Sequence, residues 1–140
     1  MLFDKQNLFS DKQAITADAA STNVIDLTGR LKEVAFGTPI PLRIQVVEGF
    51  TVTGTVSVEV KVQTDDNAAF SSPKTLATSG AISSTDLVAG SVIPINFVPK
   101  GNEGYMRLYY DVTISSGGSI TAGKFTAGII AGDDASYQDM

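Results

Sequence analysis

Hydrophobic and polar residues alternate with a period of two along the longest apolar stretches of the chain. Valine occupies every second position in residues 56–62, and an apolar series repeats in the same way in residues 106–114. Successive side chains of a strand point to opposite faces of a sheet, so each stretch predicts a strand with one buried face. The positions predicted to face the core are Val56, Val58, Val60, Val62, Leu108, Tyr110, Val112 and Ile114.

Shorter runs of the same kind extend the pattern to most of the chain. They lie at residues 23–27, 42–46, 74–78, 93–97 and 125–129. In the fourth run Ile93, Ile95 and Phe97 share one face. Pro94 cannot donate a backbone hydrogen bond, so we expect this strand at an edge or with an irregular start. Residues 84–88 predict a single helical turn, with Ser84 or Thr85 as its N-cap.

Turn residues separate these runs at short intervals. Ser116-Gly117-Gly118-Ser119 offers the positive φ values of a tight turn and predicts a hairpin between two apolar alternations. Residues 48–49, 65–67 and 100–104 contain further turn-forming residues. Strands at short spacing without long helices are typical of a two-sheet sandwich or a barrel.

Residues 1–22 follow neither the strand period nor the helix period. The apolar pairs Leu2-Phe3 and Leu8-Phe9 are separated by charged and polar residues. Such a segment either packs back on its own sandwich, as termini often do, or docks on another chain. We predict an N-terminal arm at residues 1–22 and a single sandwich domain at residues 23–140.

The arm hypothesis makes residues 1–16 a contact with a neighbouring chain, through Leu2, Phe3, Leu8 and Phe9. Burying one such side chain contributes about 1.5–3 kcal/mol before the cost of ordering the backbone. On this hypothesis, deletion of the first ten residues leaves the sandwich folded.

The composition argues against enzymatic function. The chain has no His, no Cys and no Trp. It therefore lacks the most frequent general base near neutral pH, thiol nucleophiles and thiolate metal ligands. A serine triad or a zinc site cannot be built in its usual form. We expect no catalytic residue, no cofactor and no metal.

Charge and hydropathy restrict the partners. The formal net charge is −5, from 10 basic and 15 acidic residues, and no run of Lys and Arg occurs. Nucleic-acid binding needs a clustered basic face, and a membrane-spanning helix needs about 20 apolar residues in succession. The first residues lack the basic and apolar regions of a signal peptide. We expect no nucleic-acid partner, no membrane partner and no export signal.

Two kinds of candidate site remain. Asp65-Asp66 and Asp133-Asp134 are acidic pairs, but neither has the ligand spacing of a calcium loop, so we interpret them as solvated turn carboxylates. Arg107 and Tyr109 lie on the outward face of their predicted strand. Tyr and Arg are enriched at protein interfaces, so both are candidate contact residues.

Four segments are distinctive in their order and spacing. They are Leu2-Phe3-Asp4 to Leu8-Phe9-Ser10, Ala68-Ala69-Phe70-Ser71-Ser72-Pro73, Tyr105-Met106-Arg107-Leu108-Tyr109-Tyr110-Asp111-Val112 and Thr121-Ala122-Gly123-Lys124-Phe125-Thr126-Ala127-Gly128. Together they resemble the capsid cement (decoration) proteins of short-tailed bacteriophages such as the Bordetella phage. The similarity covers essentially the whole chain.

The resemblance implies a jelly-roll-like antiparallel β-sandwich, to which the pattern of residues 1–22 adds an extended N-terminal arm. It also implies a homodimer on the outer surface of an icosahedral virion, made in the bacterial cytoplasm. There the protein would bridge and stabilise subunits of an HK97-type major capsid protein. The alternative function is a carbohydrate-binding sandwich module of a phage or bacterial surface structure. Such modules usually show rows of exposed Trp or Tyr, and this chain has no Trp.

Overall fold

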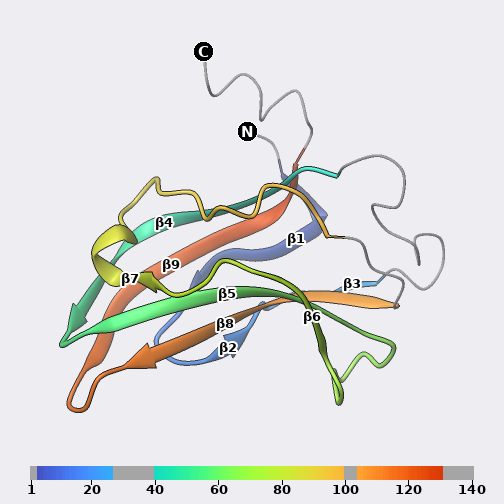
Figure 1. Cartoon of the computed structure of the whole chain (residues 1–140). Helices are drawn as coiled ribbons and strands as arrows, with labels where there is room; N and C mark the ends of the chain where they lie inside the picture. The colour runs from blue at the N-terminus through green and yellow to red at the C-terminus, as the bar shows by residue number, and fades with distance from the viewer. Residues whose placement is uncertain (1–2, 27–39, 100–103, 131–140) are drawn as a thin grey trace.

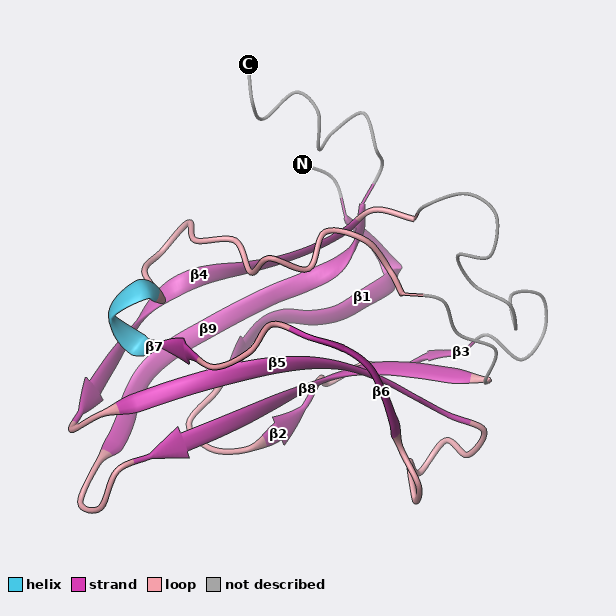
Figure 2. Ribbon diagram, viewed as in Figure 1, coloured by secondary structure: helices cyan, strands magenta, loops and turns pink. Residues whose placement is uncertain are grey.

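The computed structural model describes residues 3–26, 40–99 and 104–130, and β-strands dominate these ranges (Figure 2). The strands are β1 (Phe3–Ala14), β2 (Ala19–Ala20), β3 (Ile25–Asp26), β4 (Leu42–Thr53), β5 (Val56–Asp65), β6 (Lys74–Thr78), β7 (Ile82–Ser83), β8 (Tyr105–Ile114) and β9 (Ser119–Ile130). The predicted helical turn is a 3-10 helix, η1 (Ser84–Asp86). Its N-cap is Ser83, not Ser84 or Thr85, because the Ser83 hydroxyl accepts the Thr85 N–H.

The strands form two antiparallel sheets that face one another (Figure 1). One sheet has the order β1-β9-β4. The other has the order β2-β8-β5-β6, with β3 also paired to β8 and β7 to β5. The predicted antiparallel β-sandwich is confirmed.

One long antiparallel ribbon runs through both sheets. Residues 42–53 pair with residues 119–129 in the three-stranded sheet, from Leu42↔Ile129 to Thr53↔Ser119. The same two chain segments continue as β5 and β8 in the other sheet, from Val56↔Ile114 to Asp65↔Tyr105. The ribbon therefore folds over between its two halves, and this fold brings the two sheets face to face.

Glycines form the corner at which the ribbon folds. Gly54 and Gly117 have φ values of 77° and 78°, and a Cβ on Gly54 would lie 2.8 Å from the Ser115 hydroxyl. The Gly118 N–H donates to the Ser115 carbonyl at 2.8 Å and closes the predicted tight turn. However, the turn does not make a hairpin, because β8 and β9 belong to different sheets. The predicted pairing of these two strands is wrong.

The core fills the space between the sheets. Val56, Val58, Val60 and Val62 are at most 1% exposed, and Leu108 and Tyr110 are fully buried, as the alternation predicts. Val112 and Ile114 are half-buried near the corner. The Tyr110 ring stacks on Phe125 of the opposite sheet, with 4.9 Å between the ring centroids.

The N-terminal segment belongs to the sandwich. β1 pairs with β9 from Phe3↔Ile130 to Ala14↔Lys124, and the side chains of Phe9 and Ser10 are fully buried. Phe9 fills the chain's own core, so it cannot anchor the predicted arm on a neighbouring chain. The contact of the other residues in 1–16 with a neighbouring chain stays a prediction. The alternative, in which the terminus packs on its own sandwich, is the observed arrangement.

The predicted strand at residues 93–97 is an irregular extended segment beside β4. The Leu42, Val46 and Ile93 N–H groups donate to Asn96, Ser91 and Ile44 carbonyls, respectively, at 2.9 Å each. Ile93 and Ile95 are buried as predicted, but Phe97 is 56% exposed and Val98 is buried in its place. The period-two alternation therefore breaks after Ile95, which explains the wrong prediction for Phe97.

Candidate protein-binding surfaces

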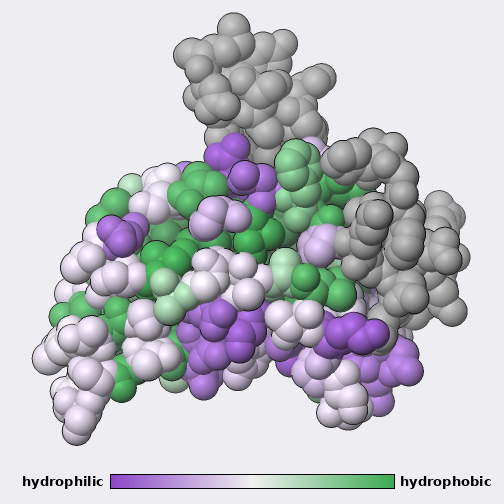
Figure 3. All heavy atoms as spheres, in the orientation of Figure 1, coloured by the Kyte–Doolittle hydropathy of each residue, from purple (hydrophilic) through white to green (hydrophobic). Residues whose placement is uncertain are grey.

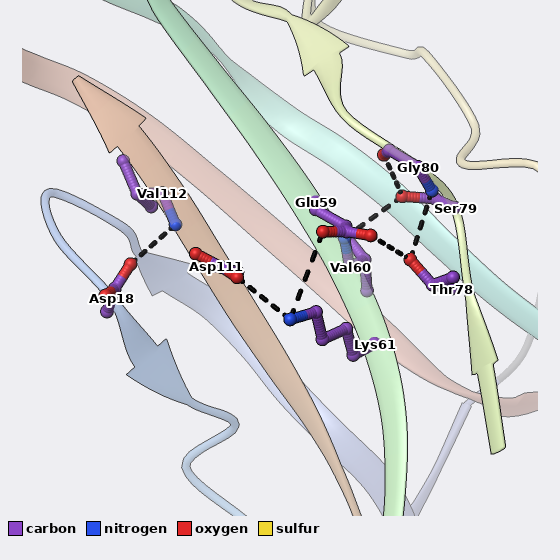
Figure 4. Close-up of polar contacts among 9 residues, drawn as sticks. All are labelled: Asp18, Glu59, Val60, Lys61, Thr78, Ser79, Gly80, Asp111 and Val112. Carbon is purple, nitrogen blue, oxygen red and sulfur yellow. Dashed lines mark hydrogen bonds and ion pairs between the residues drawn. The ribbon is translucent and has the colours of Figure 1, made fainter. Parts of the chain in front are cut away.

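The outer face of the β5–β8 pair carries a group of ion-paired side chains near its middle (Figure 4). Lys61 Nζ donates to Asp111 Oδ2 at 2.9 Å and lies 4.0 Å from Glu59 Oε1. The hydrogen bond to Asp111 raises the pKa of Lys61. Glu59 also accepts the Thr78 hydroxyl. Partly exposed ion pairs of this kind contribute about 0–1 kcal/mol each. One lysine faces two carboxylates here, so the group stays negatively charged.

An arginine placed over aromatic rings lies next to this group, toward the Asp65↔Tyr105 end of the ladder. The Arg107 Cζ lies 4.2 Å from the centroid of the Phe70 ring and 5.5 Å from that of Tyr109. Arg107 Nε donates to Gln63 Oε1 at 3.0 Å. These contacts restrict the position of the guanidinium. We call Gln63, Asp65, Phe70, Arg107 and Tyr109 the arginine–aromatic cluster.

Asp65 holds the loop that carries Phe70. Its carboxylate accepts the Ser72 N–H at 2.8 Å and the Asn67 N–H at 3.2 Å, and the Asn67 carbonyl accepts the Phe70 N–H at 2.9 Å. The hydrogen bond from Ser72 is the largest cause that lowers the pKa of Asp65. Phe70 itself has a φ of 52° and is 6% exposed, so this loop fixes its ring beneath Arg107.

The acidic pairs differ from the sequence interpretation in one respect. Asp65 does lie at a turn, but it is only 2% exposed, so the prediction of a solvated carboxylate is wrong for this residue. Asp66 is exposed, and Asp133-Asp134 lie outside the described residues. Within the described ranges, no three acidic, His or Cys residues are grouped closely enough to hold a metal ion.

A second surface follows the outer side of β4 and was not predicted. In the described part of the chain, five large hydrophobic residues are exposed, and four of them, Val47, Val88, Val92 and Phe97, belong to β4 or the segment after η1. Val92 and Phe97 bridge to Gln45 and Pro41, and the Gly90 N–H donates to the Val46 carbonyl. Figure 3 shows hydrophobic residues gathered on this side of the molecule. We call these four residues the apolar edge.

The sequence contained only part of the signal for the apolar edge. Val92 is out of phase with Ile93, Ile95 and Phe97, so the alternation already placed it outward. Phe97 becomes exposed only because the segment loses its strand period beside β4, and Val88 follows a one-turn helix. Neither could be placed without the tertiary structure.

The predicted contact residues differ in how far they are exposed. Arg107 and Tyr109 lie half-buried on the outer face of β8, as the alternation predicts. Leu8 is half-buried, whereas Phe9 is fully buried and has no surface for a partner. The structure describes only the backbone of Phe3, and Leu2 lies outside the described residues.

The fold is a two-sheet β-sandwich, with the arginine–aromatic cluster and the apolar edge on its outer sides. The chain belongs to the Bbp16 family, whose sequence profile matches residues 9–129. The name of the family suggests a protein of a Bordetella phage. A search among curated proteins found no match. In the described ranges, no helix is long and apolar enough to cross a membrane.

Proposed function

We propose that this protein is a capsid cement protein. It binds the outer surface of an icosahedral phage shell made of HK97-type major capsid protein and bridges neighbouring subunits. The observation that carries the proposal is membership of the Bbp16 family over residues 9–129, which include strands of both sheets. In this proposal the protein is made in the bacterial cytoplasm, acts as a homodimer and needs no catalytic group.

Shell stabilisation has a simple physical basis. A protein that binds the assembled shell but not free subunits stabilises the shell by mass action. Symmetry repeats each contact many times, so a modest interface has a large total effect.

The apolar edge supports a protein partner. Removal of apolar area from water drives association by about 25 cal/mol for each Å² buried. Val88 and Phe97 are both 56% exposed, so a partner that covers them gains this contribution. We assign the apolar edge to the contact with the shell.

Co-sedimentation of the full chain with coat-protein shells tests the proposal. We expect the protein to pellet with assembled shells and to leave free coat subunits in the supernatant. Phe97→Ser should weaken shell binding by about tenfold, because it removes a large apolar side chain from the contact. Val24→Ser is the matched control, since Val24 is 40% exposed but lies outside the apolar edge.

Two results would contradict the proposal. Equal binding to shells and free subunits would remove the basis for shell stabilisation. Binding to a bacterial polysaccharide, with none to shells, would favour the carbohydrate-binding module.

A further inference from the structure

We infer that the arginine–aromatic cluster is a contact for a carboxylate group of a partner protein. The identity of that partner as the coat protein rests on the proposed function, whereas the carboxylate chemistry rests on the cluster itself. The observation is the Arg107 guanidinium, held at 4.2 Å over the Phe70 ring, with its Nε committed to Gln63.

The hydrogen bond to Gln63 does not use the two terminal amino groups of the Arg107 guanidinium. The Arg107 Cζ lies over the Phe70 ring and near the Tyr109 ring, and the hydrogen bond to Gln63 uses Nε. The two terminal amino groups form the planar fork that binds both oxygens of a carboxylate. A half-buried site strengthens such a charge-assisted bond relative to one in open water.

The cluster is also rigid before any partner binds. Asp65 and Asn67 fix the loop beneath Phe70 through backbone hydrogen bonds, and Phe70 in turn supports Arg107. A side chain that is already held in its binding geometry loses little conformational entropy on association. An exposed, unsupported arginine would not have this advantage.

The charge pattern favours a single carboxylate over a polyanion. Lys61 is opposite Tyr109 in the β5–β8 ladder, but it already forms a hydrogen bond with Asp111 and lies close to Glu59. The chain has 15 acidic against 10 basic residues. A nucleic acid needs several clustered cations, whereas one acidic side chain needs one oriented guanidinium.

Shell binding by matched variants is the first test. Arg107→Lys keeps the positive charge but removes the planar fork, and we expect shell binding to weaken by about tenfold. Lys124→Ala is the control, because Lys124 is a partly exposed cation of the opposite sheet, 3.5 Å from Glu48. We expect that variant to stay within about twofold of wild type. Thermal unfolding of each variant verifies that it is folded.

A second measurement separates this inference from the proposed function. Sodium acetate, added to the full chain at constant ionic strength, should shift the NMR signals of the Arg107 Nε–Hε group and the Tyr109 ring. The same addition should leave the Lys124 signals in place. If the wild-type chain ignores shells but acetate shifts these signals, the cement function fails and the carboxylate site stands.

Several outcomes would overturn the inference. If acetate does not shift the NMR signals of Arg107, the residue has only a structural role, in which it covers Phe70. A shift with inorganic phosphate but not with acetate would mark a different anion site. Equal shell binding by wild type and Arg107→Lys would show that the shell does not use the cluster.

Discussion

The Tyr110 side chain joins apolar packing to a buried polar network. Its ring stacks on Phe125, and its hydroxyl lies 2.8 Å from the Ser10 hydroxyl. Ser10 also donates to Gln13 Oε1 at 2.7 Å, and the Gln13 amide donates to the Ala20 carbonyl. Ser10 has one hydroxyl proton and donates it to Gln13, so the Tyr110 hydroxyl donates to Ser10. Burial raises the pKa of Tyr110. This network ties β1 to β8 and β2.

Tyr110→Phe should destabilise the fold by about 1–2 kcal/mol. The substitution keeps the stacked ring but removes a buried hydrogen bond and leaves Ser10 without that donor. Tyr109→Phe is the control, because Tyr109 is half-buried on the outer face, and its cost should stay within about 0.5 kcal/mol. Urea unfolding at neutral pH measures both variants. Equal stability for Tyr110→Phe and wild type would contradict the role assigned to the network.

Asp65 makes the stability of the fold depend on pH in the acid range. Its pKa lies below the ordinary value of 3.8, so its contribution to stability is present above about pH 4. That contribution is lost as the pH falls through the lower folded-state value. Asp65→Asn should be less stable than wild type at pH 7 and should lose less stability on acidification.

Thermal unfolding between pH 7 and pH 2 tests this prediction. Asp11→Asn removes an exposed carboxylate of β1 and serves as the charge-matched control. We expect it to keep the acid dependence of the wild-type chain. Identical acid dependence for Asp65→Asn and wild type would show that the Asp65 carboxylate does not hold the loop.

β1 is the element that contributes most unexpectedly to the core. Phe9→Ala should cost about 3–5 kcal/mol, because it empties a fully buried aromatic site. Phe97→Ala, at a position that is 56% exposed, should change stability by about 0.5 kcal/mol or less. Chemical denaturation compares the two.

Contrary to the arm hypothesis, deletion of the first ten residues should unfold the chain, because it removes Phe9 from the core. A truncated protein that stays folded would contradict the structure.

Strands or parts of strands with regular pairing could be predicted from sequence, whereas the irregularly paired β1 could not. β5 and β8 pair without a break from Val56↔Ile114 to Asp65↔Tyr105, so their period of two is intact in the sequence. β1 has three shifts of register against β9, and Lys12 has a φ of 51°. Each shift changes which positions face the core, so the apolar residues of β1 show no single period.

The same physical limit applies to the binding surfaces. The outward positions of Arg107 and Tyr109 follow from the alternation in β8 alone. The ring beneath Arg107 does not, because Phe70 reaches it through a loop that is shaped by Asp65. The apolar edge likewise depends on how the segment after η1 lies beside β4. Contacts between segments far apart in sequence leave no periodic signal.

At the scale of the whole molecule, the two surfaces belong to different sheets. The apolar edge accompanies β4 of the three-stranded sheet, and the arginine–aromatic cluster lies on β5, β8 and the loop between β5 and β6. A protein that bridges two neighbours needs separate contacts of this kind. The proposed homodimer must then use a surface other than the apolar edge, because the shell already covers that edge in the proposal.

We therefore predict that the isolated protein and its Phe97→Ser variant are both dimers at micromolar concentration. Free sheet edges are commonly covered when two copies of a chain pair around a twofold axis. β1, β2 and β6 are terminal strands in the two sheets. Sedimentation should give twice the 14.7 kDa mass of the chain for both proteins. A monomeric wild-type protein would contradict the dimer. A dimeric wild type with a monomeric Phe97→Ser variant would place the apolar edge at the twofold axis and contradict its assignment to the shell.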